Sequence, residues 1–78
     1  DAVTNAPISD VEFLVTDSDG NLIGNANGKF VTDSAGTFSI TDIAPGTTLV
    51  IKETRAKVGY LLDDTPQTVK VKSNEGVC

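Results

Sequence analysis

The chain has 78 residues, 38% of them hydrophobic, with no Trp, Met or His and a formal net charge of −5. This length allows one domain with a small hydrophobic core, so we expect a single domain over residues 1–78. The negative charge argues against binding to nucleic acid or to an anionic membrane, and the lack of His excludes the usual zinc sites and Ser–His or Cys–His nucleophiles. No apolar run approaches the ~20 residues of a membrane-spanning helix. The composition therefore predicts a non-enzymatic domain with no cofactor, no metal and no membrane insertion.

The first part of the chain is expected to form one β-hairpin. Residues 1–9 are polar and contain a proline, which favours an extended lead-in. Residues 11–15 alternate between two faces and predict a half-buried strand. The Asp-Gly pair within residues 17–21 favours a tight turn, and residues 22–23 are expected to begin the returning strand.

The spacing of Asp17, Asp19 and Asn21 also suggests a calcium loop. An EF-hand loop that started at Asp17 would require Gly at its sixth position and Glu at its twelfth. Those positions hold Leu22 and Gly28. The sequence therefore favours a plain acidic turn over an ion site.

The rest of the chain alternates short apolar runs with turn residues. Strands are expected at residues 29–33, 37–41, 47–53 and 67–72, and another strand is expected to start at Tyr60. No amphipathic helix of ordinary length is visible. Short strands separated by turns at this spacing predict an all-β sandwich.

Glu53 is the candidate functional residue of the expected central strand. Alternation places Leu49, Ile51 and Glu53 on one face, so the acid would lie at the edge of an apolar interior. Such a carboxyl group is costly to bury unless it is paired or protonated. In the alternative interpretation, Glu53 is an exposed carboxylate that pairs loosely with Arg55 or Lys57, which contributes at most ~1 kcal/mol.

Residues 44–63, APGTTLVIKETRAKVGYLLD, carry a specific combination of turn, strand and loop residues. The residues that carry this combination are Pro45, Gly46, Leu49, Lys52, Glu53, Thr54, Ala56, Gly59, Tyr60 and Asp63. Upstream they are joined by Ala6-Pro7-Ile8, Val11-Glu12-Phe13, Asp19-Gly20, Thr32-Asp33 and Gly36. This pattern resembles the Cna protein B-type domains, also called SpaA-like or prealbumin-like domains, which are stalk and pilin modules of Gram-positive surface proteins. The resemblance covers nearly the whole chain.

The resemblance implies a small Ig-like or prealbumin-like β-sandwich of about six or seven short strands. It also implies a non-enzymatic stalk or spacer module in a cell-surface adhesin or pilin, located outside the cell and anchored to the cell wall. Its expected partners are neighbouring domains of the same surface protein. The alternative is a module that binds a host protein or a complementing β-strand, or a split-domain scaffold that accepts a β-strand and forms an isopeptide bond assisted by Glu53.

In domains of this kind a Lys and an Asn form an intramolecular isopeptide bond next to an acid. The resemblance assigns the acid to Glu53, whereas the reactive Lys would lie ahead of Asp1 and the Asn beyond Cys78. Neither partner can be identified in this chain. The chain is therefore expected to be either a fragment without its first and last strands or a member without the crosslink.

Missing first and last strands would leave open sheet edges, which can pair with another chain. We therefore expect either association through these edges or marginal stability. Cys78 has no other Cys with which to pair. It is expected to be an inert end residue, and the alternative is an intermolecular disulfide.

Overall fold

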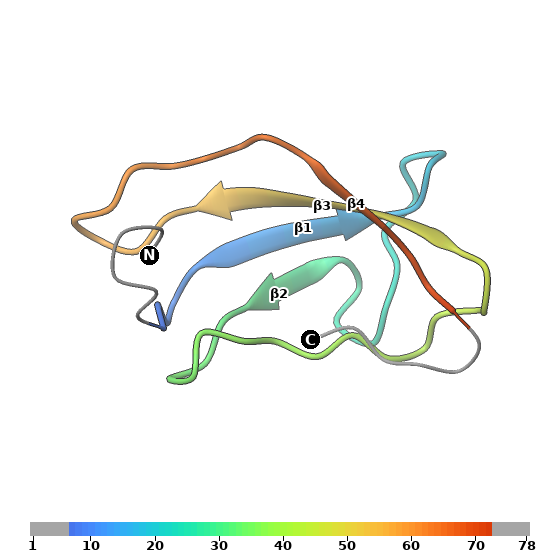
Figure 1. Cartoon of the computed structure of the whole chain (residues 1–78), viewed down its shortest axis with the longest axis horizontal. Coiled ribbons are helices and arrows are strands. Elements are labelled where there is room, and N and C mark those ends of the chain that lie inside the picture. The colour runs from blue at the N-terminus through green and yellow to red at the C-terminus, as the bar shows by residue number, and fades with distance from the viewer. Residues whose placement is uncertain (1–6, 73–78) are drawn as a thin grey trace.

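A computed structural model describes residues 7–72, which contain no helix and form one antiparallel four-stranded sheet (Figure 1). The strands are β1 (Glu12–Thr16), β2 (Lys29–Val31), β3 (Thr48–Arg55) and β4 (Gln67–Lys70). Their order across the sheet is β2-β1-β3-β4. The all-β class expected from the sequence is confirmed.

The register of the sheet defines its two faces, because residues directly opposite each other in a ladder point to the same side. Phe13 lies opposite both Phe30 and Glu53, and Val15 lies opposite Ile51. Val15 is fully buried, so these residues mark the inward face. The alternation expected for the central strand is therefore confirmed, and the carboxylate of Glu53 belongs to the inward face.

The connection between β2 and β3, which contains no named strand, covers the inward face. The fully buried side chains of Val15, Ile40 and Leu49 meet Phe30 and Val71 in one cluster. Partly buried side chains pack around this cluster, namely Ile23, Phe38, Ile43, Ile51 and Val69. The connection between β2 and β3 thus forms the second layer by packing its side chains, and it adds no strand to the sheet.

Three aromatic rings join β1, β2 and this second layer. The ring of Phe38 lies 5.2 Å from that of Phe13 and 5.4 Å from that of Phe30. Offset rings at such distances attract one another in addition to burying apolar area. Phe38 therefore holds the β2–β3 connection against the sheet.

Three expected strands are not present as strands in the described residues. Residues 22–23 contribute only an isolated bridge between Leu22 and Thr16. Residues 37–41 are extended but form no named strand, and residues 60–66 form an irregular loop. Residues 7–72 thus contain four of the six or seven strands that the resemblance implied.

Candidate functional site

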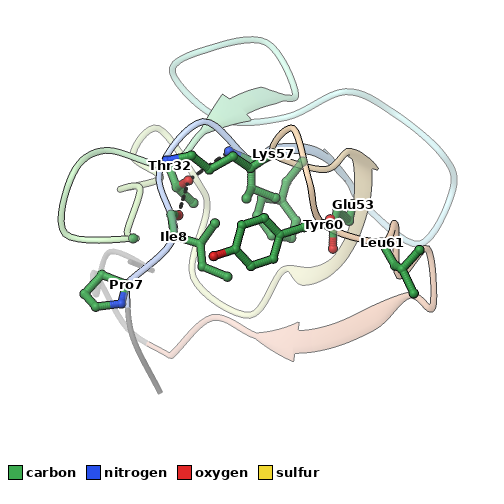
Figure 2. Close-up of a pocket in the computed structure, with 10 residues that line it drawn as sticks. Pro7, Ile8, Thr32, Glu53, Lys57, Tyr60 and Leu61 are labelled. Carbon is green, nitrogen blue, oxygen red and sulfur yellow. Dashed lines mark hydrogen bonds between the residues drawn. The ribbon is translucent and has the colours of Figure 1, made fainter. Parts of the chain in front are cut away.

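A cleft of about 300 Å³ lies between the lead-in, the start of β1 and the loop that follows β3 (Figure 2). Its walls combine apolar groups with a few polar ones. The lining residues are Pro7, Ile8, Val11, Phe13, Thr32, Gly36, Glu53, Lys57, Tyr60 and Leu61. The cleft contains the candidate acid that the sequence indicated.

Glu53 reaches the cleft from the inward face of β3, opposite Phe13. Its side chain is half-buried, and within residues 7–72 it forms no hydrogen bond or ion pair. The two cations proposed as alternative partners bind elsewhere: Arg55 lies 4.0 Å from Glu12, and Lys57 donates to Ser9. The loosely paired arrangement is therefore absent from the described structure, and the catalytic role of Glu53 stays a prediction.

Lys57 connects the loop after β3 with the lead-in. Its Nζ donates a hydrogen bond of 2.9 Å to Oγ of Ser9. This contact spans a long stretch of the chain and holds one wall of the cleft against the other. Sequence reasoning did not find it, because a surface Lys and a Ser far apart in the chain carry no pairing signal.

Tyr60 lies in the loop rather than in a strand, and 49% of its surface is exposed. The expectation that a strand starts at Tyr60 was wrong. Figure 2 shows its hydroxyl on the side of Ile8, away from the carboxylate of Glu53. The ring therefore forms a partly exposed wall of the cleft.

Thr32 fastens the lead-in to the end of β2. Its side chain is buried at 7% exposure, and its Oγ1 donates to the carbonyl of Ile8 at 2.7 Å and accepts from the N–H of Val11 at 3.0 Å. The N–H of Asp10 also donates to the carbonyl of Thr32 at 3.0 Å. Asp10 has φ of 63°, an uncommon conformation for a residue other than glycine. These contacts fix the strained entry into β1.

Glu12 occupies the opposite face of the sheet, outside the cleft. Its carboxylate accepts a hydrogen bond of 2.9 Å from Oγ1 of Thr54 and lies 3.3 Å from Nζ of Lys29. These contacts, with the Thr54 hydroxyl first and Lys29 next, hold the pKa of Glu12 below its ordinary value. A register irregularity between β1 and β3 at this point brings both Thr54 and Arg55 next to Glu12. No pattern of residues in β1 or β3 indicated this irregularity.

In the acidic turn after β1, the Asp17 carboxylate accepts hydrogen bonds from residues of the same turn. Oδ1 of Asp17 accepts the N–H groups of Asp19 and Asn21, each at 2.9 Å, and Oδ2 accepts from the side-chain amide of Asn21. These hydrogen bonds, the side-chain amide of Asn21 first, lower the pKa of Asp17. No group of three or more metal-ligating residues occurs within the described part of the chain.

The turn after β2 has the same construction, at residues 33–37. Oδ1 of Asp33 accepts the N–H groups of Ala35 and Thr37, at 2.9 and 3.2 Å. The backbone hydrogen bond from Thr37 is the main cause of a lowered pKa at Asp33. In both turns the fourth residue is a glycine with positive φ, Gly20 and Gly36. The shared pattern Asp-Ser-x-Gly is thus a structural turn motif.

The geometry of the cleft offers a single carboxyl group in a partly apolar setting. Lys29, Lys52 and Lys70 lie on the outward face by the register, and Lys57 binds Ser9. Within residues 7–72 no amine forms a hydrogen bond or ion pair with Glu53, so the described residues supply an acid without a reaction partner. Asn74, the last Asn of the chain, lies outside the described residues.

Comparison of the chain with known protein families agrees with the all-β architecture. A family model described as SpaA, a prealbumin-like fold domain, matches residues 1–78. No match was found among curated proteins or among solved structures. No helix long and apolar enough to cross a membrane occurs in residues 7–72. The chain belongs to the SpaA family of prealbumin-like fold domains.

Proposed function

We propose that this domain is a spacer in the stalk of a Gram-positive surface adhesin or pilus, and that it resists extension without catalysing a reaction. SpaA domains occur in Gram-positive surface pilins, which supports an extracellular, cell-wall-anchored location with neighbouring domains of the same protein as partners. The molecule is elongated, with extents of 35 × 21 × 20 Å. The first and last described residues lie toward opposite ends of its long axis (Figure 1).

The topology of the sheet carries this proposal. Force applied through the two ends of the chain enters β1 at its first residue and leaves β4 at its last. Because β1 and β4 both pair antiparallel with β3, on its two sides, they run in the same direction. The load then acts along the strands, and the hydrogen bonds perpendicular to it must break together rather than one at a time.

Single-molecule pulling tests this directly, in a Cys78→Ser background to control attachment. Pulling through the two termini loads both ladders along the strands. Pulling through Cys residues placed at Val58 and Thr65 instead opens the β3–β4 pair from one end. We expect a clearly higher unfolding force in the first geometry, and equal forces would contradict the spacer role.

A second candidate function rests on Glu53, the half-buried acid without a partner in the cleft. In this proposal the domain accepts a β-strand that carries an Asn and another that carries a Lys, and Glu53 assists an isopeptide bond between them. The neutral Lys amine attacks the carboxamide carbon, the new C–N bond forms and the old one breaks, and ammonia leaves. A neutral carboxylic acid can polarise the carbonyl and transfer the protons.

Intact-mass measurement after addition of the two strands as peptides tests this second function. The crosslinked product is expected to have the summed mass of the two peptides less that of one ammonia. In the presence of the Glu53→Gln variant, little of this product is expected to form. A Thr48→Ser variant, changed on the outward face of the same strand, is the control and should react like the unaltered domain. If the masses do not change for the unaltered domain, only the spacer role remains.

A further inference from the structure

The outward sheet face combines apolar and basic side chains. By the register and the Thr16–Leu22 bridge, its apolar residues are Leu14, Leu22, Val31 and Val50. Its basic residues are Lys29, Lys52, Arg55 and Lys70, with Glu12 as the single acid. Four of the six basic residues of an acidic chain are thus collected on one face.

The balance of charge leaves part of this face available to a partner. Glu12 is shared by Lys29 and Arg55. Within the described residues, Lys52 and Lys70 form no ion pair, and both are exposed. Leu22 is 50% exposed and Val31 is 41% exposed, so apolar surface is open to solvent on the same face as the basic groups.

The loop of residues 58–64 has the complementary composition. Val58 and Leu61 are 98% and 95% exposed, and about half of the surface of Leu62 is also open to solvent. The next two residues, Asp63 and Asp64, are exposed acids. Within the described residues, the hydrogen bonds that Asp63 accepts come from Thr65, in its own turn. Large apolar side chains gathered in one exposed loop are typical of an interaction site.

We propose that the 58–64 loop of one copy docks on the outward sheet face of a second copy. The apolar side chains Val58 and Leu61 would cover the apolar part of that face, while Asp63 and Asp64 would meet Lys52 and Lys70. This inference goes beyond the spacer role and does not depend on the isopeptide reaction. The partner of the loop is thus the outward face of another identical chain, and the partner of the face is the loop of another chain.

The composition of both surfaces favours this occupant over the others. An anionic polymer would use the basic groups but would leave the apolar residues of the face uncovered. A strand added at a sheet edge would use backbone groups and neither set of side chains. Because the loop and the face are different surfaces, the contact is heterologous and links copies in series. Between copies tethered in one stalk, even a weak contact of this kind is strengthened by the high effective concentration.

Sedimentation equilibrium of the full chain, with a reducing agent that keeps Cys78 from forming a disulfide, tests the proposal at up to about 1 mM. We expect association that depends on concentration. The loop variant Leu61→Asp and the face variant Lys52→Glu/Lys70→Glu should each weaken it by at least about tenfold. Ala35→Asp adds the same charge as the loop variant on an exposed turn and should leave association unchanged.

Mixing the two variants provides the decisive measurement. The loop variant keeps an intact face and the face variant keeps an intact loop, so an equimolar mixture should form heterodimers and stop there. A mixture that stays monomeric would overturn the proposal. Two other results would do so as well: an unaltered chain that stays monomeric up to the highest concentration, and variants that associate as strongly as the unaltered chain. The pulling experiment measures the spacer role independently of all these results.

Discussion

Phe13 and Glu53 lie directly opposite each other on β1 and β3, and both side chains line the same cleft. An aromatic ring and a carboxylate are not a favourable cross-strand pair, because the acid gains nothing from the ring and loses part of its hydration. The surrounding residues offer no compensation within the described part of the chain. The Phe13–Glu53 pair therefore lowers the stability of the domain, and residues that do so are typical of functional positions.

Replacing Glu53 by Leu is expected to stabilise the domain by about 0.5–1 kcal/mol, because an apolar side chain then faces Phe13. Urea denaturation measures this change in the free energy of unfolding. Glu53→Gln keeps the shape and a polar group and is the control, with a smaller effect expected. A Leu variant less stable than the unaltered domain would show that the carboxylate has a stabilising role.

Removing the Thr32 hydroxyl is expected to loosen the entry of the chain into β1. Thr32→Val keeps the shape but leaves the N–H of Val11 and the carbonyl of Ile8 without their side-chain partner, which costs about 1–3 kcal/mol. Thermal unfolding followed by circular dichroism measures the loss. Thr32→Ser keeps the hydroxyl and should retain most of the stability. If Val and Ser variants unfold alike, these hydrogen bonds contribute little.

The sequence predicted the strands whose side chains alternate and the turns that contain glycine. β1, β3 and β4 were found within one or two residues of the expected bounds, because alternation in residues 11–15, 47–53 and 67–72 follows the exposure of the two sheet faces. The expected inward position of Glu53 followed from the same period. Side-chain alternation is thus a sufficient signal where one face of a ladder is buried.

The sequence failed where extended chain packs against the sheet without forming a named strand. Residues 37–41 have the alternation of a strand, since Phe38 and Ile40 both contact the core, but they cover the sheet instead of joining it. The apolar run after Tyr60 suggested a strand, yet its side chains are mostly exposed. Local composition does not encode which backbone groups find partners, and it did not reveal the Lys57–Ser9 contact or the irregularity at Thr54.

Acid is expected to destabilise the domain through its two Asp turns. The pKa values of Asp17 and Asp33 are held below their ordinary value of 3.8 by hydrogen bonds present only in the folded state. A lowered folded-state pKa gives stability that is present above pH 3.8 and is lost as the pH falls through the folded-state pKa. The melting temperature should therefore decrease below about pH 3.8.

The double variant Asp17→Asn/Asp33→Asn tests this cause. Melting temperatures between pH 2 and pH 7, scanned by circular dichroism, should show a flatter decrease in acid than those of the unaltered domain, together with lower stability at pH 7. Asp19→Asn changes one charge in the first turn and leaves both hydrogen-bonded carboxylates in place, so it should retain the steep decrease. An unchanged acid response in the double variant would assign the effect to other groups.

Gly24 is expected to tolerate a side chain less well than Gly46. It has φ of 92°, and a Cβ at this position would lie 2.8 Å from Cζ of Phe30 and 2.9 Å from Cγ2 of Ile40, both in the core. Gly46 has a similar φ of 85° with nothing within 4 Å of its Cβ position. Ala at either site carries the strain of a left-handed conformation, but only Gly24→Ala also forces the core apart.

The difference between the two variants isolates this steric cost. The free energy of unfolding of Gly24→Ala should be about 1–3 kcal/mol lower than that of Gly46→Ala, which is the usual cost of overpacking a core. Urea denaturation of both variants under the same conditions gives the difference. Equal stabilities would mean that Phe30 and Ile40 can move aside, and hence that the layer formed by the β2–β3 connection is held more loosely than its buried side chains indicate.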